Sequence, residues 1–182
     1  MHSWRVLLLP YLEQQALYDE YDFSQPWDGL HNRKLAARMP ELYALHGDYK
    51  PGLTTTNYLA VVGEETAWPG ETPLASEDVT DELSSTILIV ENRGAEVPWM
   101  APTDLSLATM SFEINSPEGV SSKYDEPAAV MLDGSLHRLR NDLPAAALRA
   151  LLTAAGGEDV QKYEDQWILL PDGRERPLAP PD

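Results

Sequence analysis

The sequence contains no cysteine among its 182 residues. This absence excludes a disulfide framework, a metal site built from thiolates and a cysteine nucleophile. Basic residues are also scarce, because 13 lysines and arginines stand against 30 aspartates and glutamates, for a formal net charge of −17. A surface this acidic repels phosphate backbones and anionic lipid headgroups, so we expect no nucleic-acid partner. The charge serves solubility, or it attracts divalent cations or a basic partner.

Long apolar runs are absent as well. No stretch of about 18 apolar residues is present, so no segment of this sequence is expected to span a bilayer. The longest apolar cluster near the start, VLLLPYL, is broken by Pro10. The opening MHSW lacks the basic and hydrophobic regions of a signal peptide. Met1 is therefore either a true start or a boundary within a longer protein.

What the sequence does contain is typical of a globular protein. Apolar residues make up 43% of the chain, with five tryptophans and eight tyrosines. We expect a single α+β globular domain over residues 1–160, in which N-terminal helices pack on a mainly antiparallel sheet. Residues 161–182 are expected to form a C-terminal extension, with a second hairpin around Pro171-Asp172-Gly173 and a frayed, proline-rich end.

Helical patterns occupy the beginning of the domain. Apolar residues at helical spacing predict a helix that Ser3 caps and that ends near Asp22. Pro10 is tolerated if a new first turn begins there, and it would kink a continuous helix. A second helix is expected at about Asn32 to Leu45, bent at Pro40.

Strand patterns follow from residue 54 onward. The segment TTTNYLAVVG has strand composition, and Ser85 to Asn92 predicts a strand buried on both faces. Ala128 to Leu139 predicts a hairpin whose Asp133-Gly134 pair forms a type I′ turn. A helix capped by Asp142 is expected next, with an apolar stripe of leucines, and ending at Gly156-Gly157.

Catalytic motifs are missing. The four histidines are far apart in the sequence and show no ligand spacing, and there is no G-x-S-x-G elbow, P-loop or G-x-G-x-x-G. We therefore predict that the protein is not an enzyme. A hydrolase with paired carboxylates is the remaining catalytic alternative, and it requires two carboxyl groups in one cleft.

Acidic residues crowd one predicted loop. Glu77, Asp78, Asp81 and Glu82 precede the strand that begins near Ser85. Oxygen ligands converging in a loop suit Ca²⁺, whereas a solvated run of charge explains the same residues without any ligand. No cofactor is predicted, with calcium at these four residues as the alternative.

Three tryptophans lie in loops rich in proline, glycine and aspartate. They are Trp27, Trp68 and Trp99. Core filling is the simplest interpretation, but loop tryptophans also stack on sugars or anchor a protein partner. These residues are the candidate contacts for a ligand or partner.

Several blocks of sequence resemble one family. The blocks are Trp4 to Asn32, TTNYLAVVG from Thr55 to Gly63, the VPW of Val97 to Trp99, and VMLDGSLHRL with the following ALRALLTAAGGE. Together they resemble a large planctomycete family of unknown function that is itself similar to type II secretion pseudopilins. Its members carry a prepilin-type leader, an N-terminal hydrophobic helix, and a signature of His, nine residues, then Asp-Gly.

This chain departs from the family pattern in several places. The leader and hydrophobic helix that would precede Trp4 are absent, and Lys123 occupies the position ten before Asp133, where the signature histidine is expected. The resemblance implies a pseudopilin-like head on the periplasmic face of the envelope, anchored to the membrane only through the missing helix. A chain that starts at Met1 would instead be cytoplasmic. Protein partners or self-association are expected, with saccharide or peptide binding through the loop tryptophans as the alternative function.

Overall fold

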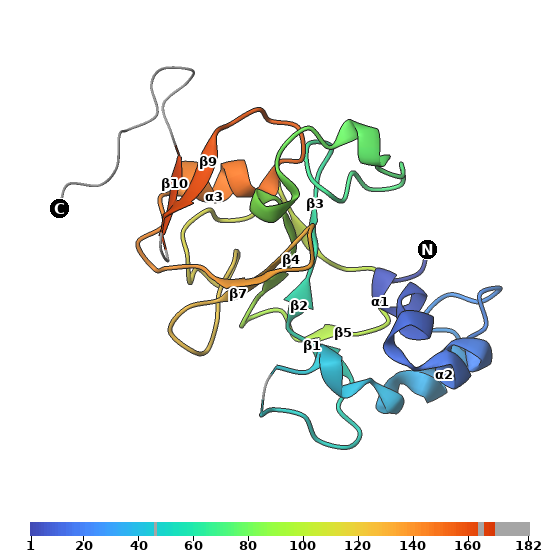
Figure 1. Ribbon diagram of the computed structural model, residues 1–182. Coiled ribbons are helices and arrows are strands. Elements are labelled where there is room, and N and C mark those ends of the chain that lie inside the picture. Colours follow the sequence, from blue (N-terminus) through green and yellow to red (C-terminus); the bar gives the residue numbers. More distant parts are fainter. Residues whose placement is uncertain (46, 164–165, 170–182) are drawn as a thin grey trace. The chain divides into compact units, whose positions relative to one another are not determined.

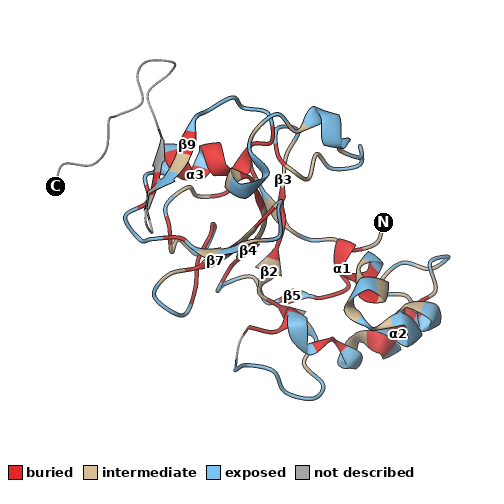
Figure 2. Ribbon diagram, in the orientation of Figure 1, coloured by how far each residue is buried: buried red, intermediate tan, exposed pale blue. Residues whose placement is uncertain are grey.

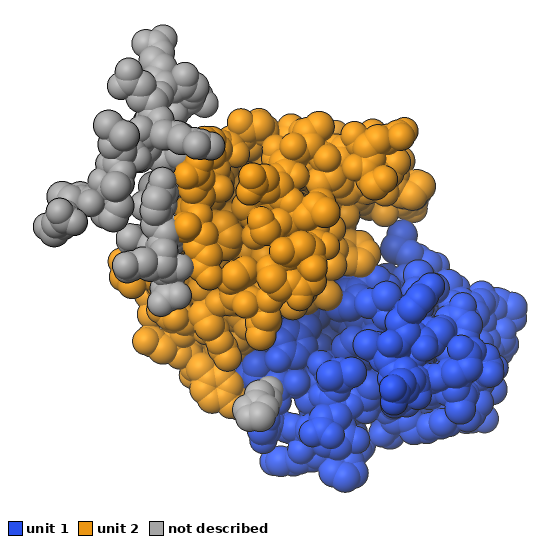
Figure 3. All heavy atoms as spheres, in the orientation of Figure 1, with its two compact units in different colours: residues 1–59, 92–104 blue, residues 60–91, 105–182 orange. Residues whose placement is uncertain are grey.

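The computed structural model describes residues 1–45, 47–163 and 166–169 (Figure 1). The chain divides into two compact units, which are described separately (Figure 3). Unit 1 consists of Met1–Leu59 and Asn92–Asp104, and unit 2 of Ala60–Glu91 and Leu105–Asp182. Each unit is therefore assembled from two separate stretches of sequence. Within the described ranges, no helix combines the length and the apolar character needed to cross a membrane.

The predicted α+β class is confirmed, because short helices accompany several antiparallel strand pairs. The α-helices are α1 (Trp4–Leu7), α2 (Gln15–Glu20) and α3 (Ala145–Leu152). The 3₁₀ turns are η1 (Leu9–Leu12), η2 (Asn32–Arg38), η3 (Glu41–Tyr43), η4 (Ser76–Asp78) and η5 (Leu83–Ser85). The strands are β1 (Thr55–Thr56), β2 (Tyr58–Leu59), β3 (Val61–Val62), β4 (Ile87–Glu91), β5 (Val97–Pro98), β6 (Leu105–Ser106), β7 (Ala128–Met131), β8 (Leu136–Arg138), β9 (Val160–Tyr163) and β10 (Gln166–Leu169).

The first predicted helix is broken into three pieces. Ser3 caps α1 as predicted, because its hydroxyl accepts a hydrogen bond from the backbone N–H of Arg5 at 3.2 Å. Pro10 then falls within the first turn of η1, where a missing N–H costs least. Glu13 ends η1 with a φ of 59°, a left-handed conformation that no helix can continue. The new first turn at Pro10 is one of the two expected outcomes, whereas the break at Glu13 was not predicted.

The rest of unit 1 contains 3₁₀ turns, the short strand β2 and the antiparallel pair β1–β5. The second predicted helix is realised as η2 and η3, and the interruption at Pro40 is as expected because the residue before a proline avoids the helical region. Thr55 pairs with Pro98 and Thr56 with Val97, which joins the two sequence stretches of unit 1.

Unit 2 contains an antiparallel sheet in which β7 lies between β4 and β8. Ile87 of β4 pairs with Met131 of β7, and Ala129 of β7 pairs with His137 of β8. The strand predicted over Ser85 to Asn92 is present as β4, but only part of it is fully buried. One parallel pair, β3 with β6, accompanies the antiparallel ladder.

The predicted hairpin of Ala128 to Leu139 forms, but its turn is not type I′. A type I′ turn needs positive φ at both central residues, whereas only Gly134 has one, at 83°. Gly134 N donates to the Met131 carbonyl at 2.9 Å, and Met131 N donates to Ser135 O at 2.9 Å. This pattern is a type I turn followed by a left-handed glycine, the usual three-residue hairpin loop.

Helix α3 provides the centre of the unit 2 core (Figure 2). Its predicted stripe of Leu148, Leu151 and Leu152 is fully buried. Asp142 does not cap the helix; it forms an ion pair with Arg140 at 2.9 Å, and Pro144 takes the N-cap position. The helix ends at Leu152, before the predicted Gly156-Gly157.

The core of unit 2 continues beyond residue 160, the boundary predicted for the domain. Val160 and Trp167 belong to the same buried cluster as α3, and β9 pairs with β10 in an antiparallel hairpin. The hairpin predicted around Pro171-Asp172-Gly173 lies outside the described residues, as does the proline-rich end.

Candidate functional site

A polar pocket of about 630 Å³ lies on unit 2. We call it the unit 2 pocket. It is lined by the turn after β7, by β8, by the segment before η5, and by the hairpin β9–β10. The side chains that matter for its chemistry are Glu82, Asp133, Ser135, His137, Lys162 and Trp167. The pocket thus combines a serine, a histidine, a lysine and carboxylates. These residue types also form nucleophilic catalytic sites, so the direction of their hydrogen bonds decides what the pocket can do.

Three of these residues come from the turn between β7 and β8 and from β8 itself. Asp133 and Ser135 lie in the turn before β8, and His137 lies in β8. The Ser135 hydroxyl is 2.6 Å from Asp133 Oδ1 and 3.1 Å from His137 Nε2. Lys162 Nζ lies 2.9 Å from the other ring nitrogen, His137 Nδ1. We call these four residues the His137 chain.

Hydrogen-bond donation in the His137 chain runs in one direction, from Lys162 to Asp133. A lysine ammonium can only donate and a carboxylate can only accept, so Lys162 donates to Nδ1 at one end and Asp133 accepts at the other. His137 is then neutral, carries its proton on Nε2, and donates to Ser135. Ser135 in turn donates its hydroxyl hydrogen to Asp133. A catalytic dyad needs the opposite polarity, with the imidazole accepting the serine proton.

The titration behaviour of this chain agrees with that direction. Partial burial, followed by the nearby Lys162 charge, lowers the pKa of His137 from its usual 6.5. The hydrogen bonds from Ser135 lower the pKa of Asp133. Both shifts favour a neutral imidazole beside an ionised carboxylate at neutral pH.

The hairpin β9–β10 supplies the remaining wall of the pocket. Lys162 and Trp167 are directly opposed across the two strands, so their side chains share one face. The Lys162 ammonium lies 5.9 Å from the centre of the Trp167 ring, and the His137 ring meets that ring edge-on at 5.5 Å. Trp167 thus joins the core to the polar floor of the pocket.

The three predicted tryptophans are not brought together as one surface. Trp99 is 1% exposed in unit 1, where it stacks on Tyr43 and its indole N–H donates to the Ala36 carbonyl at 3.0 Å. Trp68, in unit 2, is partly buried and donates to the Leu88 carbonyl at 2.7 Å. Trp27 is partly buried in unit 1. A ligand role for these side chains stays a prediction.

The four acidic loop residues do not converge on one point. Both carboxylate oxygens of Asp81 accept hydrogen bonds from the Gly156 and Gly157 backbones, at 2.9 and 3.1 Å. Asp78 bonds back to Ala75 N, Glu77 is exposed, and Glu82 lines the unit 2 pocket. In the ranges that the structure describes, no three histidine, aspartate or glutamate side chains are arranged to hold a metal. Calcium at this loop stays a prediction.

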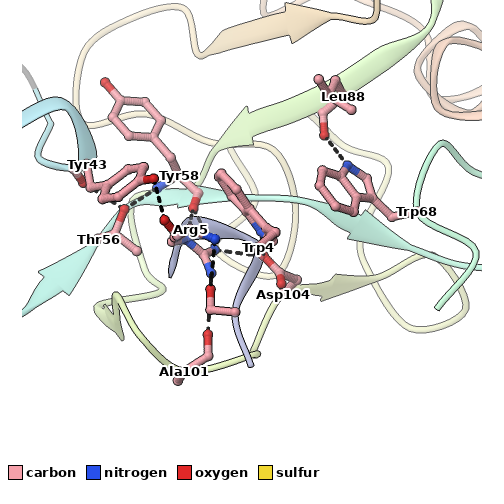
Figure 4. Close-up of polar contacts among 10 residues, drawn as sticks. Trp4, Arg5, Tyr43, Thr56, Tyr58, Trp68, Leu88, Ala101 and Asp104 are labelled. Atoms are coloured by element: carbon pink, nitrogen blue, oxygen red, sulfur yellow. Dashed lines mark hydrogen bonds and ion pairs between the residues drawn. The ribbon is translucent and has the colours of Figure 1, made fainter. Parts of the chain in front are cut away.

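Unit 1 holds a buried cation that the sequence pattern does not suggest (Figure 4). The Arg5 side chain is fully buried and pairs with Asp104 at 2.7 Å. Its guanidinium also donates to the Tyr58 carbonyl at 2.7 Å, and lies over the Trp4 ring at 4.4 Å. Burial lowers the pKa of Arg5, and Asp104 opposes that shift. We call these residues, with Tyr43, whose hydroxyl donates to Arg5 O at 2.7 Å, the Arg5 network.

The comparisons with known proteins reach only the N-terminal segment, which contributes part of this network. Residues 1–46 match the model of a family described as protein of unknown function (DUF1559). No curated protein and no solved structure shows significant similarity to the chain.

The matched segment has a structural role in this fold. It contains Trp4, Arg5 and Tyr43, whose polar groups bond to the backbone or to Asp104. Asp104 and Tyr58 lie outside the matched range, so the segment completes its hydrogen bonds only with later parts of unit 1. The match therefore covers a scaffold and includes no part of the unit 2 pocket.

Sequence motifs do not predict the His137 chain, because the spacing of its four residues matches no catalytic or metal-binding pattern. The alternation of Asp133, Ser135 and His137 along a predicted hairpin arm was the available signal. Nothing local connects them to Lys162, which is 25 residues further on and requires the register of a second hairpin.

We expect His137 to titrate with a midpoint below 6.5. Since its folded pKa is lowered, protonation favours the unfolded state, so stability declines as pH falls through the unfolded pKa. Histidine ring signals followed by NMR from pH 8 to pH 5 measure the midpoint. Lys162→Met removes the second cause of the shift, so its midpoint will be higher. A wild-type midpoint at or above 6.5 would show that the imidazole is not held neutral.

Proposed function

We propose that this chain is a non-catalytic assembly or binding domain of a bacterial cell envelope, acting through contacts with other copies of itself. The observation that carries the proposal is where its apolar surface lies. Among described residues, seven of the ten exposed large hydrophobic side chains occur in the first 49 positions of unit 1. Tyr11 is 83% exposed and Leu30 77% exposed. Unit 1 therefore carries most of the large apolar side chains that the described residues expose, and exposed apolar surface is typical of protein interaction sites when it is contiguous.

The polar groups of the protein support a non-catalytic role. The Arg5 network uses its hydrogen bonds internally, and the His137 chain directs the Ser135 hydrogen toward Asp133 and away from the imidazole. Neither arrangement presents an activated nucleophile. The net charge of −17 argues against a nucleic-acid partner.

An envelope location is supported by the match at the N-terminal end. Residues 1–46 match a family of unknown function, and the sequence blocks resemble pseudopilin-like proteins that carry a hydrophobic helix ahead of this region. A helix attached there would emerge a few residues before the exposed side chains of Leu7 and Tyr11. Copies anchored side by side would then bring these side chains into contact.

We expect the endogenous protein to sediment with membranes and to yield dimers when intact cells are crosslinked. A Leu7→Gln/Tyr11→Gln variant will weaken self-association about tenfold or more, because two exposed apolar contacts are lost. Immunoblots of the fractions, and sedimentation equilibrium of the purified chain, measure both effects.

The matched control is Leu83→Gln/Tyr124→Gln, which removes two exposed apolar side chains from unit 2. It should crosslink as the wild type does. A monomer of 20.3 kDa found in the cytosol would contradict the envelope role. Equal association by both double variants would contradict the assignment of the surface.

The alternative, a saccharide- or peptide-binding module built on the loop tryptophans, has less support. Trp99 lies in the core, and the indole N–H of Trp68 already has an acceptor in Leu88. These contacts give Trp68 and Trp99 structural roles of their own, so the alternative has less to support it than the assembly proposal.

A further inference from the structure

The loop of residues 22–32 in unit 1 is fixed by its own polar groups. Asn32 is fully buried, and its side-chain N–H groups donate to the Asp22 and Pro26 carbonyls at 2.9 and 3.0 Å. Its side-chain oxygen accepts from Asp22 N at 2.9 Å. The Asp22 carboxylate accepts from the Ser24 backbone at 2.9 Å and from the Gln25 side chain at 2.6 Å. The loop is thus preorganised, so a partner that binds it does not have to order its backbone.

The end of this loop exposes one apolar side chain beside two cations. Leu30 is 77% exposed. The N–H of Arg33 donates to the Gly29 carbonyl at 2.9 Å, which closes a helical turn over these residues. Arg33, three positions after Leu30, lies on the same side of this turn, with Lys34 next to it. Both cations are exposed, and neither side chain has an ion-pair partner among the residues that the structure describes. We call these three residues the Leu30 surface.

Charges of opposite sign are separated along this chain. Residues 29–40 contain three basic residues and no acidic one, whereas residues 51–92 contain eight acidic residues and no basic one. Unit 1 has six basic residues against nine acidic ones, a net charge of −3, and unit 2 has seven against 21, a net charge of −14. Two copies that met through unit 2 alone would repel each other. A contact between the Leu30 surface of one copy and unit 2 of another brings opposite charges together.

Unit 2 has a groove whose composition matches the Leu30 surface. Its volume is about 640 Å³, and we call it the unit 2 groove. Its apolar lining includes Pro69, Pro73, Leu74 and Ala155, and its carboxylates belong to Glu64, Glu65, Asp78 and Glu158. Glu65 already pairs with Arg149 at 2.9 Å. The other three carboxylates are exposed, so the groove offers apolar contact for a leucine and acceptors for two cations.

We propose that the Leu30 surface of one copy docks into the unit 2 groove of a second copy. Leu30 contacts the apolar lining, while Arg33 and Lys34 face the exposed carboxylates. This inference rests on the self-association proposed above, and it adds a contact distinct from the one through Leu7 and Tyr11. The contact is heterologous, because the two surfaces that meet are different.

Sedimentation equilibrium of the purified chain tests this contact. Arg33→Glu/Lys34→Glu should weaken self-association about tenfold or more, because attraction across the contact becomes repulsion. The matched control, Lys50→Glu/Lys123→Glu, makes the same change in net charge at two other exposed lysines and should associate as the wild type does. Circular dichroism confirms that each variant is folded.

The response to salt separates this contact from a purely apolar one. Raising NaCl from about 50 to about 500 mM screens the attraction between opposite charges, so association should weaken. Two chains of net charge −17 that met only through apolar side chains would instead associate more strongly, because salt screens their repulsion.

A reversed groove identifies the second surface. Glu64→Lys/Asp78→Lys should also associate weakly by itself, since its groove now repels the cations of the Leu30 surface. When it is mixed with Arg33→Glu/Lys34→Glu, every surface meets a groove of opposite charge, and association should return. A contact between two identical surfaces would not be restored by mixing.

Three results would overturn the proposal. The first is unchanged association of Arg33→Glu/Lys34→Glu, together with association that strengthens in salt, which would leave the contact through Leu7 and Tyr11 standing. The second is a mixture of the two reversed variants that stays as dissociated as each variant alone. The third is a wild-type chain that binds phosphatidylglycerol vesicles through Arg33 and Lys34 but does not associate with itself, which would contradict the assembly proposal as well.

Discussion

Replacement of Arg5 by methionine will lower the free energy of unfolding by about 3–5 kcal/mol, the cost of leaving a buried charge without its partner. Asp104 is only 8% exposed at its side chain, so it would remain largely desolvated after it loses the guanidinium. The Tyr58 carbonyl would also lose the two guanidinium donors that it accepts, at 2.7 and 3.1 Å. Urea denaturation followed by circular dichroism measures the loss.

A double variant separates the ion pair from the packing. Arg5→Met/Asp104→Leu removes both charges, and buried pairs replaced by apolar residues regain much of the lost stability. We expect the double variant to be more stable than Arg5→Met alone. If the two variants unfold at the same urea concentration, the charge on Asp104 is not what destabilises the single variant.

Replacement of Trp99 by alanine will cost about 3–5 kcal/mol, as expected for a large aromatic side chain removed from a core. Trp99 stacks on Tyr43 with ring centres 5.9 Å apart and is 1% exposed. Trp99→Phe keeps an aromatic ring against Tyr43 but loses the hydrogen bond to the Ala36 carbonyl, so we expect it to cost about 1–2 kcal/mol. Thermal melts and urea titrations give both values.

Trp27→Ala is the matched control in the same unit. Trp27 lies in a loop and is only partly buried, so its removal should change stability by less than that of Trp99. If Trp99→Ala were as stable as the wild type, the tryptophan would not be a core residue, and the binding interpretation would regain support.

Local patterns in the sequence predicted the parts of the fold that depend on neighbouring residues. Ser3 caps the first helix, and the arms of the hairpin around Gly134 form where they were expected. The type of turn was wrong because Asp133-Gly134 fits two hairpin loops, and only the backbone conformation of Asp133 distinguishes them. The break at Glu13 had no signal either, since glutamate seldom adopts a left-handed conformation.

The functional groups were predicted less well because they depend on distant contacts. Arginine is rarely buried, and the residue that makes burial of Arg5 possible is 99 positions away. Trp99 lies in a proline-rich segment that suggested a surface loop, but it packs against Tyr43 from a separate stretch of sequence. The unit 2 pocket needs the register of β9 with β10, which places Lys162 opposite Trp167.

The division of unit 1 into two stretches of sequence has a consequence for biosynthesis. A growing chain emerges from the ribosome with its N-terminal part first, and domains tend to fold as they emerge. Here the first 59 residues carry Arg5 but not Asp104, which emerges only after the whole Ala60–Glu91 segment of unit 2. Until then Arg5 cannot form the ion pair with Asp104 that accompanies its burial. Unit 1 therefore cannot complete its folding until the Ala60–Glu91 segment of unit 2 has been synthesised. A nascent chain halted before residue 104 should still be cleaved readily by proteases.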